Sequence, residues 1–461
     1  MIRTHFKKFK ISDRKLIILI LFLALMIRIL YTVSLGKEIS YPIRDQSYYL
    51  DLARNIASGK GLMLSREYWE LRQSMINNIP ELKKRFSNLE EWLKSTPWGI
   101  IKAGEPTSFC PPLYPIFLAS IIKIFGENYI IIRLLQSFIG VALVYLVYLI
   151  GKLIFNTNIG LIAALICSFY PFFIYYTGYA MTETLNITLI TLLIYLFYIT
   201  VRNKSDLLPF LLGIVLAMTC LIRAMMFAFF LIIIILLLLE IPKGFKFKKS
   251  LYFFIGFTVL MTPWILRNYI IHGQIVIVPT TGGATMWMRN NPDVVIPEMR
   301  QAGFTVPEKV INNIRRRDLI KYPEFGDENE VERNKIITER VKEFIKANPL
   351  FFSYLCKNRF LWYMSFTGST ERTFWHKLIG FLTWGLILPL SLFGLLLAAI
   401  KGKFKDILIM VILMGFFAGV HTIVHGGIRY RLPTDPFFII LASFSIIYIW
   451  DWFSKSRISH E

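Results

Sequence analysis

The sequence contains little charge for its length. Charged residues make up 18% of its 461 residues, whereas a soluble globular chain carries about 25%. Hydrophobic residues account for 55%, and the mean hydropathy is +0.54. Several apolar runs reach the roughly 20 residues that cross a bilayer. These features exclude an ordinary soluble domain and predict a single polytopic, all-α membrane protein over residues 1–461.

Cysteine is also scarce, with four residues in the whole chain, and none has the close spacing of a metal site. Cys167 and Cys220 lie within apolar runs, where they are expected to pack as small hydrophobic side chains. Cys110 and Cys356 fall in predicted loops on the same side of the membrane. A disulfide between these two and a pair of free thiols are both compatible with that placement.

Acidic residues are few compared with basic ones, 30 Asp and Glu against 52 Lys and Arg, which gives a formal net charge of +22. Nucleic-acid binding would use such an excess, but membrane topology explains most of it. We predict ten spans, at 15–35, 129–150, 159–178, 184–201, 207–222, 225–240, 250–270, 376–400, 407–424 and 435–453. Eighteen Lys and Arg residues of the tails and alternate loops then share one side, as cytoplasmic residues do. Both termini are therefore expected in the cytoplasm, with no nucleic-acid partner.

Two long loops remain on the predicted outer side, 36–128 and 271–375. The first ends with "PPLYPIFLASIIKIFG" (111–126), which is short for a span and begins with prolines, so we expect a helix lying along the interface. The second contains an amphipathic segment, 331–349, expected to form a surface helix. The first span follows a basic tail without a small-residue cleavage site, which predicts a retained helix rather than a signal peptide.

Two carboxylates stand at the predicted outer ends of spans. Asp45 follows span one in "YPIRDQSYYLDL", and Glu183 follows span three in "YTGYAMTETL". Each has a plain structural explanation, because Asp45 can cap the helix that starts at Gln46 and Glu183 suits the dipole of the next span. Ionisable groups at membrane depth are costly, however, and tend to mark function. Both acids are therefore candidates for one site on the outer face.

Four arginines also stand at outer span ends, against the usual bias of positive charge toward the cytoplasm. They are Arg223, Arg267, Arg429 and Arg431. Any one of them can extend toward lipid headgroups, but four together predict phosphate binding, because a planar guanidinium binds phosphate through two hydrogen bonds. His421 and His425 share one helix face, where the sequence favours a polar cavity lining over a metal site, since no third ligand is evident.

The segment "TTGGATMWMRNNP" (280–292) in the second outer loop suits an anion and a sugar. Its glycine pair predicts a tight turn with exposed backbone amides. Trp287 supplies a flat ring, and Asn290 and Asn291 supply amide donors and acceptors. A glycine-rich turn alone is a weak signal for either ligand.

Taken together, these residues resemble the polytopic GT-C glycosyltransferases of the protein O-mannosyltransferase and lipid A aminoarabinose transferase type. The matching pieces run in the family's order from about residue 28 to residue 445: "RDQSYYLDLARNIASGKGL", "PPLYPIFLA", "MTETL", "LIRAMM", "TPWILRNY", "TTGGATMWMRNNP" and "RYRLPTDP". The resemblance implies a GT-C bundle of about ten transmembrane helices with two large outer loops bearing interfacial helices. It also implies a polyprenyl-phosphate sugar donor.

The resemblance places Asp45 at the family's catalytic acid and Glu183 at its second acidic position, where many relatives carry Asp. The sequence departs from the family at Cys110, because some relatives have a Glu-Lys pair before the interfacial proline, so that part of their donor or metal site is not carried over. A divalent ion and its absence are both compatible with the pattern. No soluble domain is expected after the tenth span, unlike several longer relatives.

The predicted reaction is an inverting transfer of a sugar to a protein, lipid or glycan acceptor. Asp45 is the expected base, with Glu183 orienting the acceptor or sharing that role. The four arginines are expected to stabilise the leaving phosphate. Expected sugar or acceptor contacts are Tyr48, Trp287, Asn290 and His425. The alternatives are a flippase or transporter for a polyprenyl-linked sugar, and a polysaccharide ligase or polymerase.

Overall fold

A computed structural model describes residues 12–36, 44–70, 100–102, 104–240, 246–366 and 373–458. Within these ranges the chain folds almost wholly into helices, and the only β geometry is an isolated bridge between Met63 and Pro106. The predicted all-α class is therefore confirmed.

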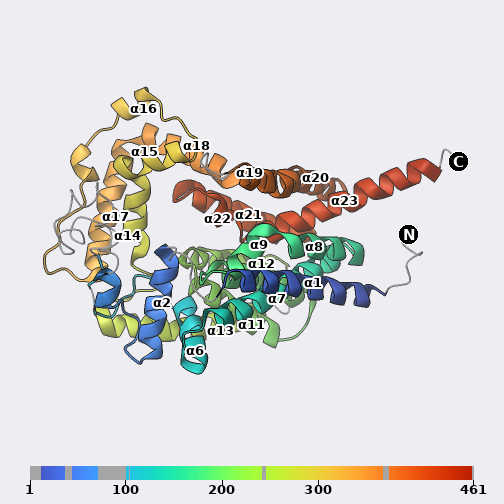
Figure 1. Cartoon of the computed structure of the whole chain (residues 1–461), viewed down its shortest axis with the longest axis horizontal. Coiled ribbons are helices and arrows are strands. Elements are labelled where there is room, and N and C mark those ends of the chain that lie inside the picture. Colours follow the sequence, from blue (N-terminus) through green and yellow to red (C-terminus); the bar gives the residue numbers. More distant parts are fainter. Residues whose placement is uncertain are drawn as a thin grey trace.

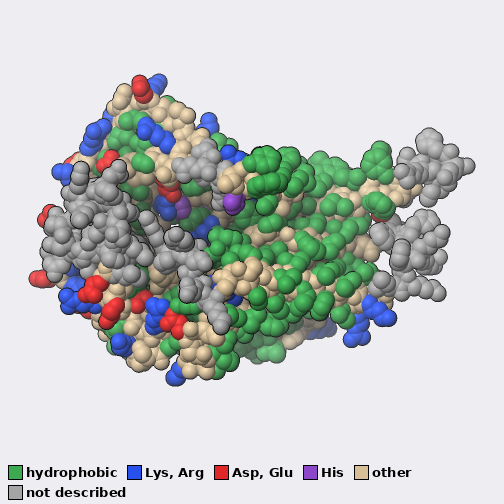
Figure 2. Space-filling view, viewed as in Figure 1, with side chains coloured by type: hydrophobic (Ala, Val, Ile, Leu, Met, Phe, Trp, Pro, Cys, Tyr) green, Lys and Arg blue, Asp and Glu red, His purple; other side chains and the backbone are tan. Residues whose placement is uncertain are grey.

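The apolar runs form a bundle whose helices lie roughly along one direction (Figure 1). Its members are α1 (Asp13–Ser34), α7 (Tyr129–Ile154), α8 (Thr157–Phe169), α9 (Pro171–Thr177), α10 (Glu183–Arg202), α11 (Leu207–Cys220), η3 (Ala224–Ala228), α12 (Phe229–Glu240), α13 (Lys246–His272), α19 (Phe374–Gly380), η5 (Phe381–Gly385), α20 (Leu386–Ile400), α21 (Phe404–Ile423) and α23 (Asp435–Ile458). Hydrophobic side chains cover most of the bundle on the face that Figure 2 shows, as a lipid-facing surface requires.

Among the described residues, seven helices are long and apolar enough to span a membrane when α19, η5 and α20 are counted as one (Phe374–Ile400), and the bent pair α8 and α9 makes an eighth if it counts as one span. The chain is thus a multi-pass membrane protein, although three of the ten predicted spans differ from a simple crossing helix. The run 159–178 is broken by a 54° bend. There Pro171 forces Tyr170 into an extended conformation. The runs 207–222 and 225–240 form helices shorter than a full span.

The remaining helices gather at one end of the bundle, which we call the loop end (Figure 1). They are α2 (Arg44–Ala57), α6 (Leu113–Phe125), α14 (Thr281–Asn290), α15 (Pro292–Gln301), α16 (Glu308–Asn312), η4 (Arg317–Ile320), α17 (Glu330–Ala347), α18 (Pro349–Met364) and α22 (Ile428–Arg431). The helices predicted at 111–126 and 331–349 are confirmed as α6 and α17. A capping box starts α17, in which Asn329 and Glu332 satisfy each other's backbone N–H groups.

The beginning of α1 and the end of α23 lie together at the opposite end, which we call the terminal end (Figure 1). This agrees with the even number of crossings that the charge pattern predicts, while the cytoplasmic placement of the terminal end stays a prediction. All four cysteines are free. The disulfide alternative for Cys110 and Cys356 is therefore wrong, since Cys110 is buried beside α2 and Cys356 lies on α18.

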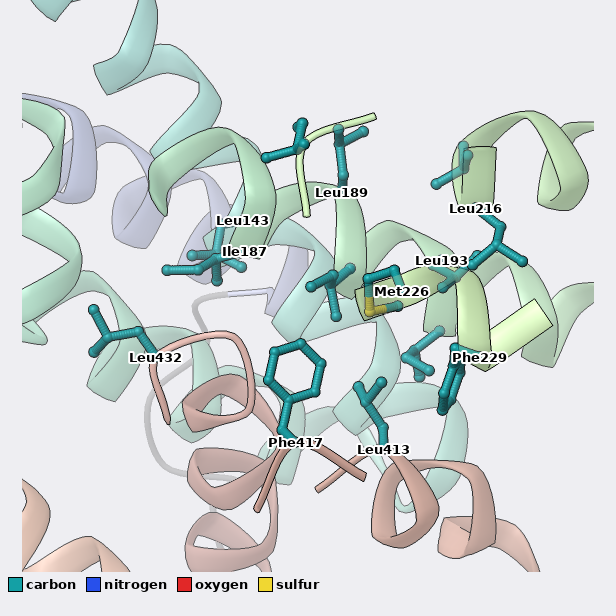
Figure 3. Close-up of a cluster of buried hydrophobic side chains, with 14 of the residues drawn as sticks. Leu143, Ile187, Leu189, Leu193, Leu216, Met226, Phe229, Leu413, Phe417 and Leu432 are labelled. Carbon is teal, nitrogen blue, oxygen red and sulfur yellow. The ribbon is translucent and has the colours of Figure 1, made fainter. Parts of the chain in front are cut away.

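The core of the bundle is a continuous cluster of aliphatic and aromatic side chains from helices far apart in the sequence. Figure 3 shows part of it, where Leu143, Ile187, Leu193, Leu216, Met226, Phe229, Leu413 and Phe417 face one another. Tight backbone contacts complete the packing of α11 against α13. A Cβ at Gly213 would lie 2.1 Å from the Phe253 carbonyl oxygen, and one at Gly256 would lie 2.1 Å from the Phe210 carbonyl oxygen.

Gly256→Val should therefore destabilise the bundle, because the added side chain forces α11 and α13 apart. Overpacking of this kind costs about 1–3 kcal/mol. We expect a lower thermal unfolding midpoint of the protein purified in detergent. Gly415→Val on α21 is the matched control, since a Cβ there meets no described atom within 4 Å beyond its own helix backbone and chain neighbours. Equal midpoints for the two variants would contradict the packing described.

Candidate active site

A network of two carboxylates and two guanidiniums lies at the loop end. Arg429 of α22 bridges both acids: its Nη1 donates to Asp45 Oδ2 at 2.5 Å, and its Nε donates to Glu183 Oε1. Arg223, just before η3, donates from Nη2 to the same Glu183 oxygen at 2.9 Å and to Thr182 Oγ1 at 3.1 Å. Four of the predicted site residues, from four separate chain segments, are therefore in direct contact.

The local structure explains why each acid stands where it does. Asp45 and Glu183 occupy the first turns of α2 and α10, where the helix dipole favours negative charge. Gln46 fixes α2 against the loop before α10, because its buried side-chain oxygen accepts the Ala180 N–H at 2.8 Å. Because Gln46 adjoins Asp45 in the chain, this contact also sets the position of the Asp45 carboxylate.

The two carboxylates differ sharply in exposure. The Glu183 side chain is 3% exposed and that of Asp45 is 47% exposed. A buried carboxylate is tolerated only when cations and hydrogen bonds compensate it, which is what Arg223 and Arg429 do for Glu183. Glu183 thus anchors the two arginines, and Asp45 presents a carboxylate that a substrate can reach.

Both guanidiniums have N–H groups that are not used in hydrogen bonds to described residues. Arg223 and Arg429 are 27% and 23% exposed. Among the described residues, Nη1 of Arg223 and Nη2 of Arg429 have no acceptor. The network combines two guanidiniums with two carboxylates, so their formal charges cancel, yet it offers unused N–H groups beside an exposed carboxylate. Two guanidiniums placed in this way can bind an anionic oxygen group such as a phosphate.

Aromatic rings and a neutral histidine flank the arginines. The Arg223 guanidinium lies 5.9 Å from the centre of the Tyr430 ring, and the His425 ring meets Tyr430 edge-on at 4.3 Å. Burial lowers the pKa of His425 well below its usual value, and the Arg289 guanidinium lowers it further. His425 is therefore uncharged near neutral pH. In the part of the chain that the structure describes, no three His, Cys, Asp or Glu side chains group as a metal site requires.

Arg267 lies away from this network and binds backbone instead. It donates to the carbonyl oxygens of Thr107 at 2.9 Å and Leu62 at 3.2 Å, and to Asn268 Oδ1 at 2.9 Å. Its guanidinium also stacks over Trp264 at 5.4 Å. The structure therefore places this predicted phosphate ligand as a tie between α13 and the first outer loop.

Arg431 is likewise separate from the two acids, although it is only two residues from Arg429. Residues at i and i+2 point to different sides of a helical turn. The Arg431 side chain is fully buried; it donates to Asp435 Oδ1 at 3.0 Å and to the Tyr363 carbonyl at 3.0 Å, and lies 3.5 Å from the centre of the Trp384 ring. It joins α22, α18 and α23.

The predicted sugar or acceptor contacts Tyr48, Trp287 and Asn290 are all buried. Tyr48 packs against the ring of Tyr68 on the inner side of α2. Trp287 meets Tyr322 edge-on at 5.3 Å, and Asn290 donates to the Met286 carbonyl at 2.8 Å. These side chains pack inside the loop end. None of them contacts the residues of the Asp45 network.

Glu330 is a structural residue of the loop end that the sequence did not reveal. Standing in the first turn of α17, it accepts hydrogen bonds from Thr107 Oγ1 at 2.6 Å, the Ser108 N–H at 2.9 Å and the Thr280 hydroxyl. It thereby joins the two outer loops beside Arg267. Burial raises the pKa of Glu330 above its usual value despite these hydrogen bonds.

This shift predicts a pH dependence of stability. A carboxyl group whose pKa is raised on folding stabilises the fold when protonated, and that contribution is lost as pH rises through the folded-state pKa. We expect the thermal midpoint of Glu330→Gln to fall less than that of the wild type as pH rises above about 4.5. The control is Glu339→Gln, because Lys342 lowers the pKa of that exposed carboxylate. If the thermal midpoints of the wild type and Glu330→Gln changed in parallel with pH, the raised pKa of Glu330 would be contradicted.

Comparison with known proteins adds a family match over part of the chain. The family model for dolichyl-phosphate-mannose-protein mannosyltransferase matches residues 110–266, about a third of the length. That segment contains Glu183 and Arg223, whereas Asp45 and Arg429 lie outside it. No curated protein matches the chain by sequence.

Solved structures match over nearly the whole chain. The archaeal oligosaccharyltransferase AglB from Archaeoglobus fulgidus, in complex with an inhibitory peptide and a dolichol-phosphate, aligns with 99% of this chain and 52% of its own, at 14% identity and a TM-score of 0.53. Its apo form gives the same coverage and identity, with a TM-score of 0.54. ArnT from Cupriavidus metallidurans in the apo state aligns with 93% of this chain and 76% of its own at 9% identity, but its TM-score of 0.39 is too low to establish a shared fold.

The AglB matches show the fold: the chain has a membrane-embedded helical fold like that of AglB, of the type that the sequence resemblance predicts. It spans about half the length of the AglB structures.

Proposed function

We propose that this protein is an inverting glycosyltransferase, which moves a sugar from a polyprenyl-phosphate donor to an acceptor on the outer face of the membrane. The observation that carries the proposal is the exposed Asp45 carboxylate held by Arg429, in contact with the Glu183 and Arg223 pair. The GT-C fold, the mannosyltransferase family match and the dolichol-phosphate in the AglB complex support it. The sugar and the acceptor are left unspecified.

The arginine pair would bind the leaving group. When the bond between the anomeric carbon and the phosphate oxygen breaks, the electron pair stays on the phosphate, whose charge increases. Preorganised donors aimed at a developing charge are among the strongest catalytic effects. The unused N–H groups of Arg223 and Arg429 are suited to this role, because Glu183 already holds both guanidiniums in place.

Asp45 would act as the base. The acceptor oxygen or nitrogen attacks the anomeric carbon on the face opposite the phosphate, and its proton passes to the Asp45 carboxylate. One displacement inverts the anomeric centre. Because polyprenyl phosphate leaves without prior protonation, a second catalytic acid is not required, unlike in glycoside hydrolysis. This division of roles matches the exposure of Asp45 and the burial of Glu183.

A flippase is the main alternative, and the position of the network argues against it. Transporters place their substrate sites near the bilayer midplane, between broken helices. Here the charged network lies at span ends, in the first turns of α2 and α10. A polysaccharide ligase or polymerase would share the donor chemistry and differ in its acceptor.

The proposal is tested with the purified protein in liposomes that contain a polyprenyl-phosphate sugar with a radiolabelled sugar. Incubation with an extract of surface glycans, glycolipids and proteins should move label onto an acceptor and leave polyprenyl phosphate. Movement of intact labelled donor between leaflets without release of the sugar would instead identify a flippase and overturn the proposal.

A further inference from the structure

We propose a second ligand site at the terminal end of the bundle, which binds the headgroup of one anionic phospholipid. A cavity of about 580 Å³ opens there between the start of α8, the turn from α20 to α21, and α23. These helices pack side by side in the bundle (Figure 1). The cavity lies at the end opposite the Asp45 network, so it is separate from the proposed active site.

The rim of the cavity carries positive charge. Lys401 and Lys403 line it from the turn between α20 and α21. Lys401 lies 5.4 Å from the centre of the Tyr448 ring and forms no ion pair with a described carboxylate. Lys403 contacts Asp406 at 3.1 Å in an exposed pair, which holds it only weakly. The described lining holds two ammonium groups and one carboxylate, Asp451. Asp406 offsets Lys403 from outside the lining, and Lys401 stays available to an anion.

The wall of the cavity is apolar. Phe155 stacks on Phe444 at 4.4 Å, and Ile447 lies beside them in the lining. Trp452 also lines the cavity and is 61% exposed, as aromatic residues at a membrane interface are. A positive rim next to an apolar wall suits a ligand with a phosphate at one end and an acyl chain at the other. A free phosphate ion would leave the aromatic wall unused.

Location supports the same ligand. The cavity is at the end of membrane-spanning helices, where phospholipid headgroups are the most abundant phosphate groups. Basic residues at this depth each strengthen binding to anionic lipid. An uncharged or zwitterionic lipid would fill the apolar wall equally well, but would gain little from Lys401 and Lys403. The site should therefore discriminate by headgroup charge.

The experiment is native mass spectrometry of the full-length protein, delipidated in detergent and titrated with phosphatidylglycerol or phosphatidylcholine. The wild type should bind one phosphatidylglycerol in preference to phosphatidylcholine. The double variant Lys401→Gln, Lys403→Gln should weaken phosphatidylglycerol binding by about tenfold. The double variant Lys401→Arg, Lys403→Arg should retain it, which shows that the turn still folds. Lys248→Gln is the control, since Lys248 pairs with Asp206 outside the cavity.

The proposal would be overturned by equal binding of both lipids by the wild type, by an undiminished preference in the glutamine variant, or by an equal loss in the Lys248→Gln control. Displacement of the lipid by excess inorganic phosphate would assign the site to a free anion and also overturn it. Sugar transfer is an independent readout and should persist in the glutamine variant, because the site does not depend on the proposed reaction.

Discussion

Asp45→Asn should leave the fold intact and lower the turnover of sugar transfer by about a thousandfold, within the range for loss of a general base. The asparagine side chain has the same size and its oxygen can still accept the Arg429 N–H, but it cannot take the proton of the acceptor. Little stability should be lost, because Asp45 is 47% exposed. The measurement is single-turnover transfer of labelled sugar by the purified protein at saturating donor, alongside its thermal midpoint.

Asp51→Asn is the matched control, because Asp51 stands on the same helix and has a structural role. Its buried carboxylate accepts the Ser65 N–H at 2.8 Å and the Ser65 hydroxyl at 2.6 Å, which fixes the segment after α2. We expect this variant to lose stability while the folded fraction keeps its turnover. Wild-type turnover in Asp45→Asn would remove Asp45 from the reaction.

Arg429→Gln should lower kcat/KM for the donor by about a hundred- to a thousandfold, the usual loss when one preorganised donor to a developing anion is removed. Among the described residues, Arg429 alone donates hydrogen bonds to both Asp45 and Glu183, so its loss also removes the hydrogen bond that positions the base. Arg429→Lys should recover only part of the activity, because one ammonium group cannot reproduce the fork that bridges two carboxylates. Steady-state kinetics with varied donor measures both variants.

Arg431→Gln tests whether Arg431 stabilises the fold rather than acting in the active site. Its guanidinium is completely buried and joins three helices, and breaking a buried pair costs about 3–5 kcal/mol. We therefore expect poor folding of Arg431→Gln, whereas Arg429→Gln folds and fails in catalysis. If Arg431→Gln folded normally and lost only donor affinity, Arg431 would be a ligand of the donor and its structural role would be wrong.

Much of the fold could be predicted from the sequence, because a bilayer demands long apolar helices and each of the ten predicted runs is helical in the structure. The departures arise from effects that hydropathy does not measure. Pro171 bends the third run, and the chain leaves α11 for an extended conformation at Arg223. The second departure also shapes the candidate site, because it brings Arg223 into contact with Glu183 at the start of α10.

The candidate site was predictable only where the cost of charge made a residue conspicuous. Asp45, Glu183, Arg223 and Arg429 stand out as ions at span ends, and the structure brings them together. The same argument cannot distinguish Arg267 from the arginines of the network, although Arg267 has a structural role. The groups that bind it are backbone carbonyls of Leu62 and Thr107, about 200 and 160 positions away along the chain.

Gln46 and Glu330 were not predictable for a related reason. Each occupies the first turn of a helix, where a polar residue needs no further explanation. Their real partners come from distant segments: Ala180 for Gln46, and Thr107, Ser108 and Thr280 for Glu330. Contacts of this kind leave no periodicity or motif in a single sequence, so only the fold reveals them.

The most direct measurement is the position of the donor phosphate on the protein. A polyprenyl phosphate with a photoreactive group next to the phosphate would be cross-linked to the protein in liposomes, and the labelled peptides would be mapped by mass spectrometry. Our account predicts labels on the segments that contain Asp45, Glu183, Arg223 and Arg429, with loss of labelling in Arg429→Gln. Labels confined to other segments, with no dependence on Arg429, would contradict it.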